Sequence, residues 1–134
     1  MALVDSEKKA RLVASLINRT VEGRVHWRES VNEGEFVTDF SSSSISILQH
    51  KWDDSYVHSL SVTNHRGDIV DRFHLEDVIH YIISEGRESV LFSEQTREAS
   101  GEAKHIPDYF YDLVRYNVMK VDDVYDGVLQ ELAS

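Results

Sequence analysis

Apolar and polar residues alternate one by one between Tyr56 and Thr63, and this alternation constrains the fold more than any other feature of the chain. Successive side chains of a β-strand point to opposite faces, so the run predicts a strand with one buried and one solvated side. The predicted buried side carries four residues: Tyr56, His58, Leu60 and Val62. Such a strand requires a sheet around it and a cover for its apolar face.

Three further segments, residues 35–40, 44–48 and 69–73, have the same strand character. The links between them are too short for the crossovers that parallel strands need, which predicts an antiparallel meander within residues 24–74. Val25 and Trp27 also alternate with polar neighbours, so a short additional strand is expected there. We therefore expect four to five strands.

The link at residues 64–67 suits a type I turn in which the final glycine adopts a positive φ beside a bulge. Turn preference and burial predict different registers for the strand that follows. Without a bulge, Ile69 and Phe73 share the buried face; with one extra residue, Val70 and Arg72 take their place. We favour the unbulged register, because burying an Ile or a Phe is worth roughly 1.5–3 kcal/mol.

On both sides of the meander the hydrophobic period changes from two residues to 3.6, which predicts amphipathic helices. The first helix is expected over residues 6–22, with Asp5 or Ser6 as its cap and Gly23 as its stop. Its apolar stripe consists of Leu12, Val13, Leu16, Ile17 and Thr20.

The C-terminal part, residues 75–134, is predicted to be mainly helical. One helix is expected from Leu75 to Glu85, and Pro107 opens another, since proline is well tolerated in a first turn. Asp122 is predicted to cap the last helix, whose inward stripe consists of Val124, Val128, Leu129 and Leu132.

Residues 87–105 are less regular. Val90–Phe92 suit either a short strand or a docked turn, and a short helix is expected at residues 94–99 between mobile segments. Together these patterns predict one α+β domain of residues 1–134. It has an N-terminal helix, an antiparallel β-meander, and C-terminal helices packed on one face of the sheet.

The order of the first half, a helix with Thr20 near its end, then Gly23, Trp27 and a meander, resembles small uncharacterised bacterial α+β domains. The resemblance covers only that half of the chain and includes no signature motif. It implies a fold outline and a bacterial setting, and it implies no activity and no functional residue.

Charge and composition exclude several classes of partner. The net charge of -10 opposes nucleic-acid backbones and anionic membrane surfaces. The chain has no Cys, which excludes disulfides and thiol chemistry and is compatible with a reducing cytoplasm. Its first six residues, Met1 to Ser6, are too few and too soon acidic for a signal peptide, and no apolar run reaches transmembrane length. A cytoplasmic protein is therefore expected.

His58 is the most distinctive ionisable residue, because it lies on the predicted apolar face of the central strand. In the unbulged register Asp71 lies diagonally across from it on the same side. A histidine oriented by a carboxylate is half of a general-base arrangement. The nucleophile motifs that would complete it are missing, so a structural His–Asp pair or an exposed His is the main alternative to catalysis.

The spacing of the seven histidines does not suit a metal site. His74 and His80 are six residues apart and point to different sides of a helix. His50 could gather with Asp53 and Asp54, but an Asp-Asp-Ser turn needs no metal to explain it. The glycines are scattered singly, so a phosphate-binding loop is not indicated. We expect no metal and no cofactor.

The aromatic residues suggest an interface. Trp52 lies in a polar turn, and Tyr111 and Tyr116 belong to a set of tyrosines spread around the last two helices. Such residues cannot all face one core, so we expect these three to contribute to binding, with a homodimer formed through the C-terminal helices.

The sequence thus favours a non-catalytic binding or regulatory module that recognises a protein partner or a small ligand. Two alternatives remain open. One is a small hydrolase or transferase that uses His58 with Asp71, and the other is a structural subunit whose activity is assembly.

Overall fold

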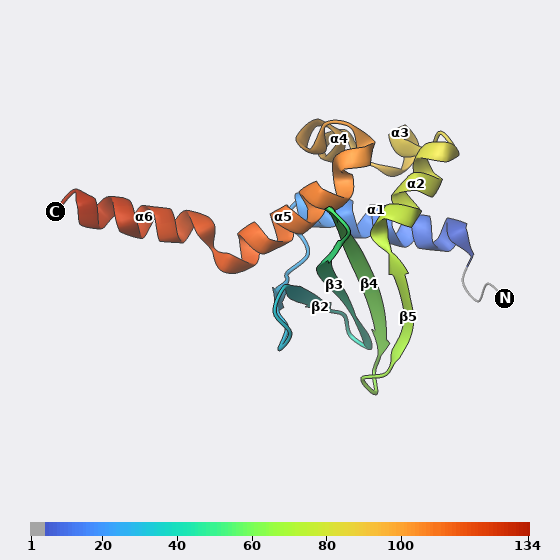
Figure 1. The fold of residues 1–134 in the computed structure, drawn as a ribbon, viewed down its shortest axis with the longest axis horizontal. Helices are drawn as coiled ribbons and strands as arrows, with labels where there is room; N and C mark the ends of the chain where they lie inside the picture. The colour runs from blue at the N-terminus through green and yellow to red at the C-terminus, as the bar shows by residue number, and fades with distance from the viewer. Residues whose placement is uncertain (1–4) are drawn as a thin grey trace.

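The computed structural model describes residues 5–134 and has an N-terminal helix, a five-stranded antiparallel sheet and C-terminal helices (Figure 1). Residues 1–4 lie outside the described residues, and the prediction that the chain does not begin with a signal peptide concerns mainly these residues. The α+β class is confirmed. Helix α1 (Ser6–Val21) precedes the five strands: β1 (Arg28–Glu29), β2 (Glu35–Asp39), β3 (Ser43–Trp52), β4 (Ser55–Asn64) and β5 (Ile69–His74).

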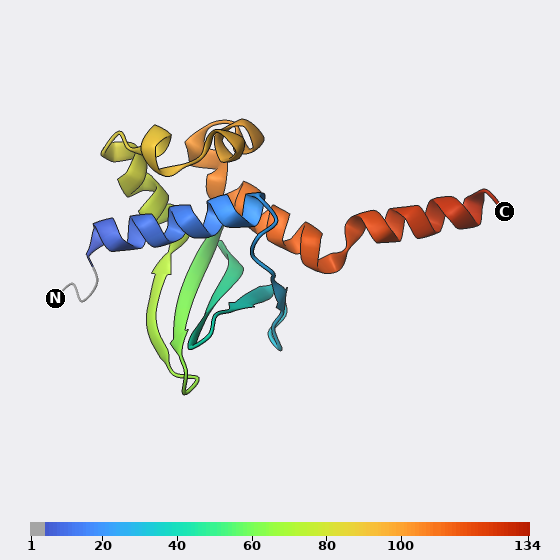
Figure 2. The ribbon, with the colours of Figure 1, turned by 180° about the vertical axis from the view of Figure 1, so that it is seen from behind.

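The sheet is a meander in which each strand pairs antiparallel with the next, in the order β1-β2-β3-β4-β5. Register aligns one row of apolar side chains across four strands: Phe36, Ile47, Leu60 and Phe73. Helix α1 crosses in front of the strands in Figure 2 and covers this face. The opposite face carries a hydroxyl-rich set, which includes Ser44, Ser46, Ser59, Ser61 and Thr63.

Helix α1 begins where the sequence predicts it. The Asp5 carboxylate accepts a hydrogen bond of 2.7 Å from the Lys8 backbone N–H, which satisfies one of the unpaired donors of the first turn. The inner side of α1 includes Val13 and Ile17, which are fully buried. They belong to the same core as Leu60 at the centre of the sheet.

The register between β4 and β5 combines the two sequence-based alternatives. Phe73 pairs with Leu60 on the covered face, as expected from burial. A bulge nevertheless lies further along, because Val62 pairs with Asp71 and Thr63 with Ile69, leaving Val70 without a partner. The unbulged prediction was therefore wrong for Ile69, which is exposed. The turn preference is satisfied near the tip, while burial determines the register where helices cover the sheet.

The strand expected at Val25 and Trp27 is shifted, and β1 consists of Arg28 and Glu29 instead. Trp27 has a different role: its indole N–H donates to Thr20 Oγ1 at 3.2 Å, and its ring meets Phe110 edge-on at 5.8 Å. The indole thus joins the end of α1 to a later helix, and this tertiary packing outweighs the local alternation.

After β5 the chain forms α2 (Leu75–Ser84), α3 (Glu88–Leu91), α4 (Glu94–Ser100), the 3₁₀ turn η1 (Ala103–His105) and α5 (Ile106–Met119). The short helix expected at residues 94–99 is confirmed as α4. The strand considered at Val90–Phe92 is not formed, since α3 ends at Leu91 and Phe92 is buried in the core.

Asn18 of α1 fixes this irregular segment. Its side-chain amide donates to the Leu91 carbonyl at 2.9 Å, and its Oδ1 accepts from the Ser93 backbone N–H at 3.1 Å and from Thr96 Oγ1 at 2.8 Å. Thr96 is fully buried. One side chain therefore makes hydrogen bonds to three polar groups of this segment, two of them main-chain groups that are partly buried.

The last helix, α6 (Val121–Leu132), projects away from the rest of the molecule (Figure 1). Its cap is Lys120 in the left-handed conformation, with φ of 53°, so the prediction of an Asp122 cap was wrong. The Asp122 carboxylate instead accepts a hydrogen bond from the Tyr116 hydroxyl of α5. The predicted apolar stripe is present but does not face inward, because no residue of α6 is buried.

Candidate functional site

His58 lies at the centre of a buried polar cluster between β4 and the helices. Its side chain is fully buried, and its Nδ1 lies 2.6 Å from Glu76 Oε2. The other carboxylate oxygen of Glu76 accepts from the His58 backbone N–H at 2.9 Å. The ring also packs against Tyr111, with the two ring centroids 5.2 Å apart. One carboxylate in the first turn of α2 thus holds both the main chain and the side chain of His58.

Each ring nitrogen of His58 has its own hydrogen-bond partner. A carboxylate only accepts, so Nδ1 carries a proton, and Nε2 lies 3.1 Å from the amide nitrogen of Gln49, which only donates. Asp108 Oδ1 lies farther away, 3.9 Å from Nε2. With this orientation of the amide, the hydrogen-bond pattern matches a ring that donates from Nδ1 to Glu76 and accepts at Nε2 from Gln49.

Glu76 is ionised in this arrangement. Burial acts to raise the pKa of its carboxyl, but the hydrogen bonds from the side chain and the backbone of His58 outweigh it and hold the pKa below the ordinary 4.5. The charge also lies in the first turn of α2, where the helix dipole favours an anion.

Asp71, the carboxylate expected beside His58, has a different partner. It lies on the covered face opposite Val62, and its Oδ2 is 3.8 Å from Lys9 Nζ of α1. Glu76 takes the place that the sequence suggested for Asp71. The structure therefore does not bring His58 and Asp71 together as a pair.

The cluster can orient and stabilise, but its geometry is poor for general-base catalysis. A general base needs a nitrogen within hydrogen-bond reach of a substrate proton. Both ring nitrogens of His58 face protein groups, Glu76 and Gln49, and the side chain has no exposed surface. The hydrogen bonds between Glu76 and His58 stabilise the packing of α2 against β4.

The three aromatic residues expected at an interface lie in different environments. Tyr111 is buried, and its hydroxyl donates to the Gly34 carbonyl at 2.6 Å, so it belongs to the core rather than to a surface. Trp52 is 67% exposed at the end of β3, and Tyr116 is partly exposed on α5. Of the three, Tyr116 lies next to the exposed apolar surface of α6, because its hydroxyl donates a hydrogen bond to Asp122 of that helix.

This surface is the stripe along α6, which we call the α6 stripe. Its members follow helical spacing and are Val121, Val124, Tyr125, Val128, Leu129 and Leu132. Leu129 is 62% exposed and Leu132 is 77% exposed, large values for the apolar face of an amphipathic helix. The α6 stripe is therefore an exposed apolar surface that residues 5–134 leave without burial.

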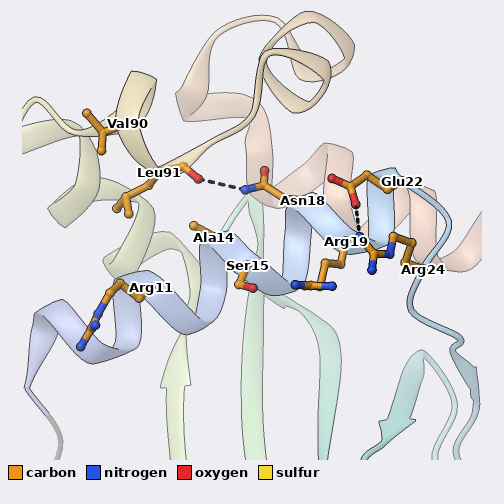
Figure 3. Close-up of a pocket in the computed structure, with 9 residues that line it drawn as sticks. All are labelled: Arg11, Ala14, Ser15, Asn18, Arg19, Glu22, Arg24, Val90 and Leu91. Atoms are coloured by element: carbon orange, nitrogen blue, oxygen red, sulfur yellow. Dashed lines mark hydrogen bonds and ion pairs between the residues drawn. The ribbon is translucent and has the colours of Figure 1, made fainter.

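A second surface is a groove of about 340 Å³ along the outer side of α1, which we call the α1 groove (Figure 3). Arginines of α1 and of the loop after it line one side, and α3 supplies an apolar wall. The residues that line it are Arg11, Ala14, Ser15, Asn18, Arg19, Glu22, Arg24, Val90 and Leu91. Glu22 is the one acidic residue among them, and its carboxylate lies 3.6 Å from the Arg24 guanidinium. Val90 is 75% exposed.

Residues 5–134 contain no cluster of three or more His, Asp or Glu side chains that could hold a metal ion. His50 of β3 lies instead beside His74 of β5, with ring centroids 5.8 Å apart. None of the helices in this part of the chain combines the length and apolar character needed to cross a membrane.

Sequence reasoning missed Glu76, Gln49 and Asn18. A signal for Glu76 existed, because the pairing of Ser59 with His74 brings the first turn of the following helix next to His58.

Comparisons of the chain with protein-family models, with curated proteins and with solved structures give no match.

Proposed function

We propose that the protein is a non-catalytic binding module that assembles with a second copy of itself through α6. The observation that supports this most directly is the α6 stripe, none of whose members is buried within residues 5–134 and all of which except Val121 are exposed. Full burial of a Val or Leu side chain is worth roughly 1.5–3 kcal/mol, so covering several of them favours association.

The length of α6 supports the same proposal. Isolated helices shorter than about 12–15 residues are marginal in water, and most helices in proteins are stabilised by packing of their apolar face. Helix α6 has 12 residues and includes Gly127, which lowers helix propensity further. A partner surface would provide the packing that α6 lacks in the monomer.

The catalytic alternative, a hydrolase or transferase that uses His58, receives less support from the geometry. His58 is fully buried and its partner is Glu76 rather than Asp71. We therefore keep assembly as the proposed activity.

Light scattering across a concentration series tests the proposal. The expected result is a mass that rises from one chain to two as concentration increases. The variant with Val128→Ser and Leu129→Ser, both at exposed positions, is expected to remain monomeric with an unchanged circular dichroism signal from the rest of the fold. A wild-type protein that stays monomeric at every concentration would overturn the proposal.

A further inference from the structure

The charges of the first and last helices are opposite. Helix α1 carries Lys8, Lys9, Arg11 and Arg19 against Glu7, a net charge of +3. Helix α6 carries Asp122, Asp123, Asp126 and Glu131 and no basic residue, a net charge of -4. Lys9 of α1 faces Phe73 and Asp71 of the sheet. The α1 groove itself is lined by Arg11, Arg19 and Arg24 against the single acid Glu22, a net charge of +2 in a chain whose total charge is -10.

Pairing of two α6 helices through their apolar stripes would bring six bordering carboxylates together, Asp122, Asp126 and Glu131 of each chain, and like charges across an interface are unfavourable. The α1 groove offers the opposite charge. Arg11 and Arg19 lie two turns apart on the same side of α1, separated by the small side chain of Ser15. Arg19 takes part in none of the ion pairs found within residues 5–134 and is available for a new one.

The apolar parts also correspond. Val90 and Leu91 of α3 form a wall along the α1 groove, and Val90 is largely exposed. Carboxylates border the α6 stripe in the same way that arginines border the groove: at 100° per residue, Asp122 and Asp126 lie along one edge and Glu131 along the other. An apolar ridge with acidic edges thus has its counterpart in a basic groove with an apolar wall.

The direction of α6 determines whether it can contact the α1 groove of its own chain or that of a second copy. The helix leads away from α1 of its own chain in both views (Figures 1 and 2). At a rise of 1.5 Å per residue, its 12 residues extend about 18 Å, comparable with the roughly 12 Å between the positions of Arg11 and Arg19.

We propose that α6 of each chain docks into the α1 groove of a second copy, so that a two-fold symmetric dimer makes the contact twice. This inference rests on the proposed function and names the surface that receives α6. A reciprocal contact of this kind is self-complementary and closes at two chains.

A charge-reversed groove tests this surface. The variant with Arg11→Glu and Arg19→Glu is expected to raise the dimer Kd by at least about tenfold in sedimentation equilibrium, because charge pairs at an interface are replaced by like charges. The matched control is Lys51→Glu with Arg66→Glu, which changes the net charge equally at exposed positions away from the groove. It is expected to dimerise nearly as wild type does.

Two complementation experiments sharpen the test. Adding Asp126→Lys and Glu131→Lys to the groove variant is expected to restore dimerisation, since both sides of the contact are then reversed. Mixing the groove variant with the Val128→Ser, Leu129→Ser variant is expected to give a heterodimer. The groove variant supplies an intact α6, and the other variant supplies an intact α1 groove that can receive it.

Each other outcome is decisive. If the groove variant dimerises like wild type while the α6 variant is monomeric, the proposed function stands and the α1 groove is not the receptor. If the control loses dimerisation equally, net charge alone explains the effect and this inference fails. A mass that grows beyond two chains overturns the reciprocal arrangement, and a monomeric wild type overturns both proposals.

Discussion

The Nδ1 atom of His58 lies 2.6 Å from the Glu76 carboxylate, which at the same time accepts the backbone N–H of His58. The two residues belong to β4 and α2, so this double contact joins the middle of the sheet to the helix that follows it. Because the imidazole is fully buried, the cost of leaving it without a partner is high.

Replacing Glu76 by Gln is therefore expected to destabilise the protein by about 1–3 kcal/mol, since a neutral amide is a weaker acceptor and leaves a buried donor poorly paired. Urea unfolding followed by circular dichroism measures the change in the free energy of unfolding. The control Glu98→Gln, at an exposed position of α4, is expected to change it by less than about 0.5 kcal/mol. Equal stability of both variants would show that the contact contributes nothing.

The same carboxylate makes stability depend on acid pH. Its pKa in the folded state lies below the ordinary 4.5, so the unfolded chain binds its proton more readily than the folded protein does. The stabilisation is complete above pH 4.5 and is lost as the pH falls through the folded-state pKa. Unfolding free energies measured from neutral to acid pH should converge between wild type and Glu76→Gln. A constant difference would contradict this prediction.

Asn18 provides the third prediction. Its side chain contacts the Leu91 carbonyl, the Ser93 N–H and the Thr96 hydroxyl, so Asn18→Ala leaves several interior groups unpaired. We expect a loss of about 1–3 kcal/mol, concentrated in the segment that it holds. Relative to wild type, the variant should show a larger increase in the rate of amide hydrogen exchange at residues 91–96 than in β3 and β4. Uniform acceleration throughout the protein would contradict a local role.

The sequence was sufficient to predict the elements that depend on local pattern. Alternation from Tyr56 to Thr63 marks the central strand, and the change to helical spacing at Leu75 marks the start of α2. These signals are strong because burial of one face imposes a fixed period on the sequence. The N-terminal cap is equally local, and of the two predicted candidates, Asp5 and Ser6, the structure has Asp5 in that position.

Long-range contacts were harder to predict. His58 was correctly placed on the covered face, but its partner comes from the next helix, whose approach depends on how β5 ends. Asp71 lies on the expected face of its strand, but its carboxylate is 3.8 Å from Lys9 Nζ of α1, a contact between distant parts of the chain that strand alternation does not predict. Periodicity also identified the apolar side of α6, yet amphipathicity indicates only that a face favours cover and not which surface supplies it.

The bulge at Val70 has a consequence for the outer edge of the sheet. Strand β5 is a terminal strand, and its unpaired N–H and C=O groups could in principle accept a further strand from another molecule. The irregular spacing at Val70, followed by the charged pair Asp71 and Arg72, interrupts the even ladder that strand addition requires. Bulges and charged residues are devices that disfavour edge-to-edge pairing of sheets, and here both lie beside the exposed Ile69 and Val70, the residues of this border that would otherwise favour such pairing.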